Sequence, residues 1–174
     1  MGTVSNIVIY LGVDLTQSSP KGNDRMTNTN AFEPAWQFQH SVDCNAPRQF
    51  VWDYWTNIVN WNDPPATFHL DGPFDAGSRL TTSLPGQTLH SLLRDVFPGY
   101  EAIIEMQLAE ATLSFHWMFE ALSSQQTQIT QRLTLSGANS GAFITQVRLF
   151  EQNTPEGMKK LVAAIERSLI TEWR

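Results

Sequence analysis

The sequence is poor in cysteine and in charge, and it has no long apolar run. Cys44 is the single cysteine among 174 residues, so no disulfide can form within the chain, and we expect a cytoplasmic protein. Charged residues make up 16% of the chain, with a formal net charge of −6. This balance disfavours nucleic acid and anionic membranes as partners, because both attract basic faces.

Segments that would place the chain in or across a membrane are also lacking. No apolar stretch approaches the roughly 20 residues needed to cross a bilayer, so we predict no membrane span. The apolar stretch at residues 7–13 has neither a basic start nor a small-residue cleavage site, and we do not expect it to act as a signal peptide.

Motifs of cofactor, metal and nucleophile chemistry are missing as well. The four histidines stand singly and far apart in the sequence, without the spacings typical of metal sites, so we predict no metal. The segment Gly137-Ala138-Asn139-Ser140-Gly141 does not have the Gly-x-Ser-x-Gly order of a nucleophile elbow. With no dinucleotide or phosphate-binding glycine motif either, we expect no cofactor.

What the chain does contain is a polar beginning followed by a patterned domain. Residues 14–31 are polar, rich in turn formers and without periodicity, and residues 1–34 are therefore predicted to be a flexible extension. Residues 35–174 are predicted to form one domain, which is long enough to bury a core of its own.

Alternating apolar residues dominate the first two thirds of that domain. They predict strands over residues 36–43, 67–70, 79–84, 88–97, 100–108, 113–119 and 127–135. The pattern around Leu92 to Val96 is irregular and does not say which face is buried. Between the first two strands we expect a short helix, with Asn45 as its cap and Pro47 in its first turn.

The C-terminal third has helical periodicity. A first helical piece is predicted over residues 140–152, and a second is expected to begin with Thr154 as its cap and Pro155 in its first position. The second piece carries an apolar stripe from Met158 to Leu169 at helical spacing. Consecutive strands joined by short turns form an antiparallel meander, whose apolar face such a stripe can cover. We therefore predict an α+β fold, a curved antiparallel sheet of about six to seven strands wrapped around a long C-terminal helix.

Several motifs carry a resemblance to a known family. They are Asn45-Ala46-Pro47 with Phe50-Val51-Trp52, then Asn60-Trp61-Asn62, Leu70-Asp71-Gly72-Pro73-Phe74 with Gly77, and Leu135-x-Gly137 followed by Pro155-Glu156-Gly157-Met158. Over residues 35–174 the chain resembles the START-like helix-grip superfamily, which includes the birch-pollen-allergen-like proteins and the polyketide cyclase/dehydrase group. The resemblance implies a cavity between the sheet and the last helix, but it does not select one function.

The candidate site residues are large aromatic side chains with two polar ones among them. The predicted ligand-binding residues are Trp36, Phe38, His40, Trp55, Phe115, Trp117 and Gln131. The aromatic residues suit the wall of an apolar cavity, and a dry packed core is the alternative. His40 is the candidate general acid or base, unless it is a hydrogen-bonded structural histidine. Gln131 can orient a ligand oxygen or satisfy a backbone group.

Three functions remain open at this stage. The first is binding of a hydrophobic small molecule, lipid-like, aromatic or polyketide-like, in the internal cavity. The second is a cyclase or dehydratase reaction in the same cavity, with His40 as the acid or base. The third is a protein-interaction module, which would need a large exposed apolar patch.

Arg94 and Glu105 are candidates for a carboxylate anchor and a base, although both also suit a solvated strand face. The sequence carries no indication of oligomeric state.

Overall fold

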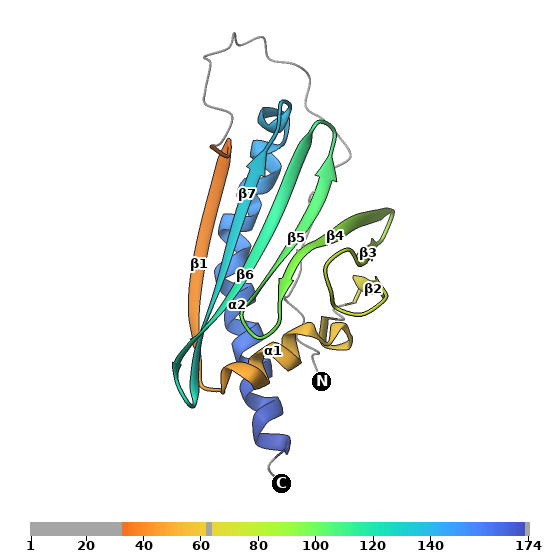
Figure 1. Cartoon of the computed structure of the whole chain (residues 1–174). Helices are drawn as coiled ribbons and strands as arrows, with labels where there is room; N and C mark the ends of the chain where they lie inside the picture. Colours follow the sequence, from red (N-terminus) through yellow and green to blue (C-terminus); the bar gives the residue numbers. More distant parts are fainter. Residues whose placement is uncertain (1–32, 62–63, 173–174) are drawn as a thin grey trace.

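The computed structural model describes residues 33–61 and 64–172, which form one sheet, a short helical segment and one long helix (Figure 1). The predicted N-terminal extension, residues 1–34, lies almost entirely outside the described residues. The elements are β1 (Trp36–Cys44), α1 (Arg48–Thr56), the 3-10 helix η1 (Ile58–Trp61), β2 (Thr67–Asp71), β3 (Arg79–Leu84), β4 (Gln87–Phe97), β5 (Glu101–Leu108), β6 (Ala111–Ser123), β7 (Gln126–Ser136), the 3-10 helix η2 (Ser140–Phe143) and α2 (Ile144–Glu172).

All seven strands belong to one antiparallel sheet in the order β1-β7-β6-β5-β4-β3-β2. Strands β2 to β7 form the predicted meander, and β1 closes the order by pairing with β7 along its whole length. The predicted α+β class and strand positions are confirmed, although β6 is longer than the expected residues 113–119. A register shift between Leu93 and Asp95 explains the irregular pattern in β4, because Arg94 is an extra residue in that ladder.

Helix α1 begins after Pro47, whose carbonyl accepts the first helical hydrogen bond from Val51 at 3.0 Å. The prediction that Asn45 caps this helix is wrong, because Asn45 lies three residues before the first helical residue. Its main-chain N–H instead donates to Oε1 of Glu166 in α2, at 2.7 Å. The buried face of α1 consists of Val51, Trp52 and Trp55, which explains why this short segment stays helical against the sheet.

Helix α2 runs along the face of the sheet behind the strands in Figure 1. The prediction of two helical pieces with a break at Thr154 is wrong, since α2 is continuous and Pro155 lies inside it. Proline lacks an N–H, which removes the helical hydrogen bond to the carbonyl of Glu151. The helix persists because one stripe is buried on both sides of the proline. This stripe consists of Val147, Phe150, Thr154, Met158, Leu161 and Ile165.

The interior next to α1 is filled by aromatic rings. Trp55 is at the centre of this cluster, with ring centroids 5.3 Å from Trp117, 5.1 Å from Phe119 and 5.2 Å from Phe74. Further along the sheet, Phe150 of α2 meets Phe115 edge-on at 5.7 Å. Burying surfaces of this size stabilises the fold by about 25 cal/mol for each Å² of apolar area.

Candidate functional site

The structure brings three of the predicted binding residues into one row on the inner face of the sheet. His40 is the cross-strand partner of Gln131, which in turn is the partner of Trp117. Phe38 and Phe115 occupy the next row, on either side of Leu133. The inward orientation predicted from the alternating pattern therefore agrees with the observed register.

Burial separates these residues into two groups. Trp55, Trp117 and Phe115 are at most 3% exposed and belong to the packed interior, whereas Phe38 and His40 are half-buried on the edge strand β1. Trp36 donates from Nε1 to Oε1 of Glu151 at 2.7 Å, which joins β1 to α2. A ligand-binding role for Trp55, Trp117 and Phe115 stays a prediction, with the dry core as its alternative.

Gln131 and His40 are the polar members of the row. Gln131 is buried at 7% exposure, and neither side chain forms a hydrogen bond with another described residue. No charged group lies beside them in the same row, whose third member is Trp117. A catalytic role for His40 stays a prediction.

A pocket of about 1050 Å³ lies at another place, where β4 separates from β5. Pairing between these strands begins at Ser91 and Met106, so residues 87–90 of β4 have no partner on β5. The hairpins β3–β4 and β5–β6 diverge from this point, as Figure 1 shows. The pocket is lined by His69, Asp71, Arg79, Thr81, Thr88, Leu89, His90, Ser91, Leu92, Glu105, Met106, Gln107, Leu108 and Ala109. None of the seven predicted binding residues is in this lining.

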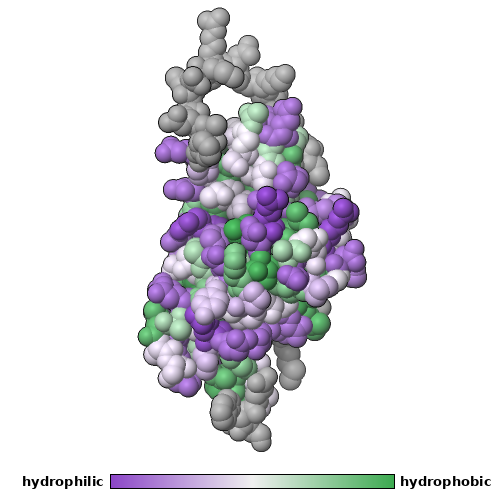
Figure 2. Space-filling view, in the orientation of Figure 1, coloured by the Kyte–Doolittle hydropathy of each residue, from purple (hydrophilic) through white to green (hydrophobic). Residues whose placement is uncertain are grey.

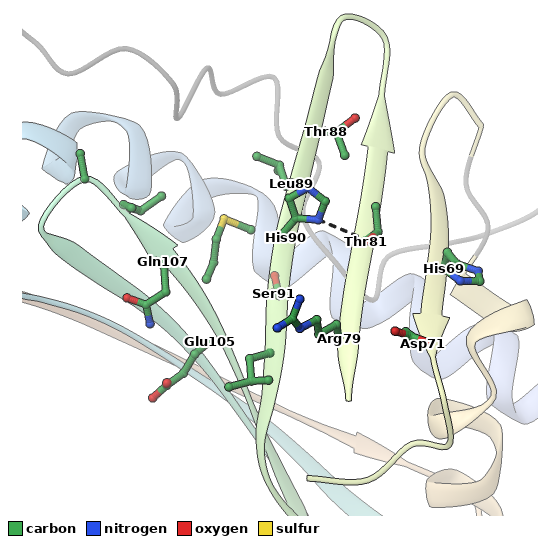
Figure 3. Close-up of a pocket in the computed structure, with 14 residues that line it drawn as sticks. His69, Asp71, Arg79, Thr81, Thr88, Leu89, His90, Ser91, Glu105 and Gln107 are labelled. Carbon is green, nitrogen blue, oxygen red and sulfur yellow. Dashed lines mark hydrogen bonds between the residues drawn. The ribbon is translucent and has the colours of Figure 1, made fainter. Parts of the chain in front are cut away.

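The lining has an apolar part and a polar part. Leu89, Met106 and Leu108 belong to the inner face, and the first two are almost fully buried. Apart from the buried Ser91, the polar side chains come from the outer face of four consecutive strands, where Figure 3 shows them around the split. In Figure 2, which has the orientation of Figure 1, apolar side chains gather in the middle of the visible face and hydrophilic side chains border them. A molecule with an apolar body and polar substituents matches this division.

Sequence reasoning missed this pocket, although a signal was present. Each strand contributes two polar residues at positions i and i+2, namely His69 and Asp71, Arg79 and Thr81, Thr88 and His90, and Glu105 and Gln107. Such a period of two is typical of a solvated strand face, which is the alternative given above for Glu105. Only the divergence of β4 and β5 turns that face into the rim of a pocket.

The charged groups of the rim are not paired with one another. Among the described residues the one ion pair joins His116 to Glu101, at 2.8 Å on the outer face of β6 and β5. Within residues 33–61 and 64–172, Arg79, Asp71 and Glu105 therefore have no oppositely charged group within 4.0 Å. Within the rim, Thr81 Oγ1 lies 3.4 Å from His90 Nδ1. The Oε1 of Gln107 accepts a hydrogen bond from Oγ1 of Thr112, outside the lining, at 3.0 Å.

The titration shifts lie away from the pocket. Burial, and to a lesser degree the negative charge of Glu166, raises the pKa of the Cys44 thiol to about 12. Burial also raises the pKa of Tyr54. A thiol with this pKa is a poor nucleophile at neutral pH, so Cys44 acts as a core residue.

Two further observations bear on what the site can hold. Within residues 33–61 and 64–172, no three or more His, Cys, Asp or Glu side chains are grouped so that they could hold a metal ion. In the same part of the chain, no helix is long and apolar enough to cross a membrane. Arg94, a candidate carboxylate anchor, is exposed at the β4 bulge and is not part of the lining.

Comparison with known proteins gives matches in structure but not in sequence. No protein-family model and no curated protein matches the chain. The Zhui aromatase/cyclase of a Streptomyces species superposes with a TM-score of 0.61 and 17% identity, covering 77% of this chain and 95% of Zhui. The di-domain aromatase/cyclase BexL gives a TM-score of 0.61 at 15% identity, over 75% of this chain and 46% of BexL.

A plant enzyme has the same architecture. Norcoclaurine synthase of Thalictrum matches with a TM-score of 0.59 and 11% identity, covering 80% of this chain and 96% of the enzyme. The chain therefore has a helix-grip fold, like these three proteins.

Proposed function

We propose that the chain binds a small amphipathic molecule, with an aromatic or polyketide-like body, in the pocket where β4 separates from β5. The observation that carries this proposal is the pocket itself. Its volume of about 1050 Å³ lies at the upper end of the range of small-molecule sites. Its apolar residues Leu89, Met106 and Leu108 can take the body of the ligand, and its polar rim can orient the substituents.

The similar structures support the class of ligand. Two of them are aromatase/cyclases and one is norcoclaurine synthase, all named for reactions of small organic molecules. A shared fold does not carry a substrate from one protein to another, so the pocket residues must decide this question. A binding role for His40 and Gln131 remains a separate prediction, which the experiment below also tests.

The test uses N-phenyl-1-naphthylamine, a neutral aromatic probe whose fluorescence rises in apolar surroundings. Ala109 lines the pocket and is exposed, so Ala109→Trp places an indole ring in the mouth without opening the core. We expect this variant to bind the probe at least about tenfold more weakly, because the added ring excludes the probe. Ala121→Trp is the matched control at an exposed position outside the lining, and it should bind like the wild type.

Two results would overturn the proposal. One is a wild-type chain that does not bind the probe, and the other is an equal effect of the two tryptophan variants. His40→Ala adds a second control, since a loss of affinity there would move the site to the inner row of His40, Gln131 and Trp117. Thermal unfolding followed by circular dichroism confirms that each variant is folded before its affinity is compared.

A cyclase-type reaction in the same pocket is the second candidate. The observation that favours it is an unpaired, half-buried carboxylate, Glu105, in the same lining as the titratable side chain of His90. Intramolecular aldol cyclisation moves a proton from carbon to a base and another from an acid to oxygen, and such groups supply both. A short poly-β-keto thioester incubated with the wild type and with Glu105→Gln tests this. Equal product yields from both, at the rate without protein, exclude the reaction.

A further inference from the structure

The guanidinium of Arg79 occupies the middle of the polar rim and has no ionic partner in the part of the chain that the structure describes. Arg79 faces Asp71 across the β2–β3 pair and Leu92 across the β3–β4 pair, and Leu92 in turn faces Glu105 on β5. Neither carboxylate comes within 4.0 Å of it. Figure 3 shows the side chain of Arg79 extending over β4, away from Asp71 and toward the side of β5.

The surroundings of Arg79 provide further hydrogen-bond donors. Thr81 and His90 are cross-strand partners in the next row of the outer face after that of Arg79 and Leu92. Gln107 lies on the far side of the split. A guanidinium offers five N–H donors in a planar fork, which suits a two-oxygen anion better than any other group in the lining. Its positive charge is permanent, because arginine does not lose its proton in proteins.

The two carboxylates of the rim do not form an alternative cation site. Asp71 is on β2 and Glu105 is on β5, three strand spacings apart. At about 4.8 Å per spacing their backbones are about 14 Å from each other, with Arg79 between them. One ammonium group cannot contact both, and either contact would leave it near the guanidinium. The other titratable side chains of the rim are His69, on β2, and His90, on β4, which are the two cross-strand partners of Thr81.

We propose that the ligand of this pocket is an amphipathic acid, whose carboxylate or similar oxyanion binds Arg79 while its apolar body occupies the β4–β5 split. This inference rests on the proposed function and adds the chemical class of the ligand. Arg79 lies next to the split, because its cross-strand partner Leu92 adjoins Ser91, where the split begins opposite Met106. An acid can thus reach the guanidinium with its body still among apolar side chains.

The experiment compares two probes that differ only in an acidic group. 8-Anilino-1-naphthalenesulfonate is N-phenyl-1-naphthylamine with one added sulfonate, so the ratio of their affinities isolates the contribution of the anion. We expect Arg79→Gln to lower the affinity ratio of sulfonate to neutral probe by about tenfold. Arg79→Lys should recover part of the ratio, because it keeps the charge and loses the fork.

The controls separate this inference from the proposed function. Arg94→Gln removes an exposed arginine of the neighbouring strand that is not in the lining, and it should leave both affinities as in the wild type. Glu105→Gln should raise the ratio, since it removes a negative charge from the rim. If the neutral probe binds and Arg79→Gln leaves the ratio unchanged, or if Arg94→Gln lowers it equally, the inference is wrong while the proposed function stands. If the neutral probe does not bind at all, the proposed function itself fails.

Discussion

Trp55 and Trp61 allow a matched test of what stabilises the aromatic cluster, because the same substitution changes different hydrogen bonds. Both indole rings are completely buried, and their centroids are 5.6 Å apart. Trp61 donates from Nε1 to the main-chain carbonyl of Trp55. The Nε1 of Trp55 is buried and finds no acceptor among the described residues. Replacing either residue by phenylalanine removes the same atoms but not the same interactions.

The expected magnitudes follow from this difference. Each Trp→Phe change loses similar apolar burial and leaves a similar cavity, so these contributions to the change in unfolding free energy nearly cancel between the two variants. Trp55→Phe also removes an unpaired buried donor, which is worth about 1–3 kcal/mol in favour of the variant. Trp61→Phe instead leaves the carbonyl of Trp55 without this donor, at a cost of about 1–3 kcal/mol. We therefore expect Trp61→Phe to be less stable than Trp55→Phe by about 2–6 kcal/mol.

The assay is urea unfolding of the two variants and the wild type, followed by far-UV circular dichroism. Thermal unfolding gives an independent check, because about 1 kcal/mol shifts the midpoint by about 2–4 °C in a chain of this length. Equal stabilities of Trp55→Phe and Trp61→Phe would refute the reasoning, as would the opposite order. Equal slopes against urea must accompany the result, so that the difference reports stability and not a change in the unfolded state.

The remaining predictions concern a tight turn and the buried thiol. A Cβ at Gly137, where φ is +115°, would lie 2.6 Å from the carbonyl oxygen of Glu110, so Gly137→Ala should cost about 3 kcal/mol in a urea titration. At Gly86 φ is also positive but no atom lies within 4 Å, so Gly86→Ala should cost only about 1 kcal/mol, and equal losses would contradict the role of the contact. The pKa of Cys44 is raised to about 12, whereas an exposed thiol ionises near pH 8.5, so the unfolded chain loses its proton first as the pH rises. The free energy of unfolding should then fall by about 1.4 kcal/mol per pH unit between about pH 9 and 12, and a decline of the same steepness in Cys44→Ala would show that the thiol is not its cause.

Local pattern was sufficient to predict the strands and, outside the irregular β4, their buried faces. Alternation in the segment from Leu113 to Phe119 identifies the inner face of β6, because side chains of a strand point to opposite sides in turn. The same argument placed His40 and Gln131 on the inner face, where the register makes them partners. It could not determine whether the residues on that face enclose a cavity or pack against each other.

Where prediction failed, a distant contact outweighed a local preference. Pro155 has the chemistry of a helix start, yet burial of the stripe on both sides of it keeps α2 continuous. Asn45 has the chemistry of a cap, yet it is held by Glu166, which lies 121 positions away in the chain. Neither contact leaves a trace in the neighbouring sequence.

Periodicities of two and 3.6 residues were enough to predict the α+β class, the positions of the strands along the chain and the buried side of the regularly alternating strands, but not the buried side of β4. The position of the pocket at the β4–β5 split depends on the tertiary structure. The pocket exists because the pairing of β4 with β5 begins only at Ser91 and Met106. Near α1, in contrast, Trp55 and Trp117 fill the interior. Register and packing are relations between segments far apart in the chain. A polar period of two, such as Arg79 and Thr81, therefore has the same sequence pattern on a solvated strand and on the rim of a binding site.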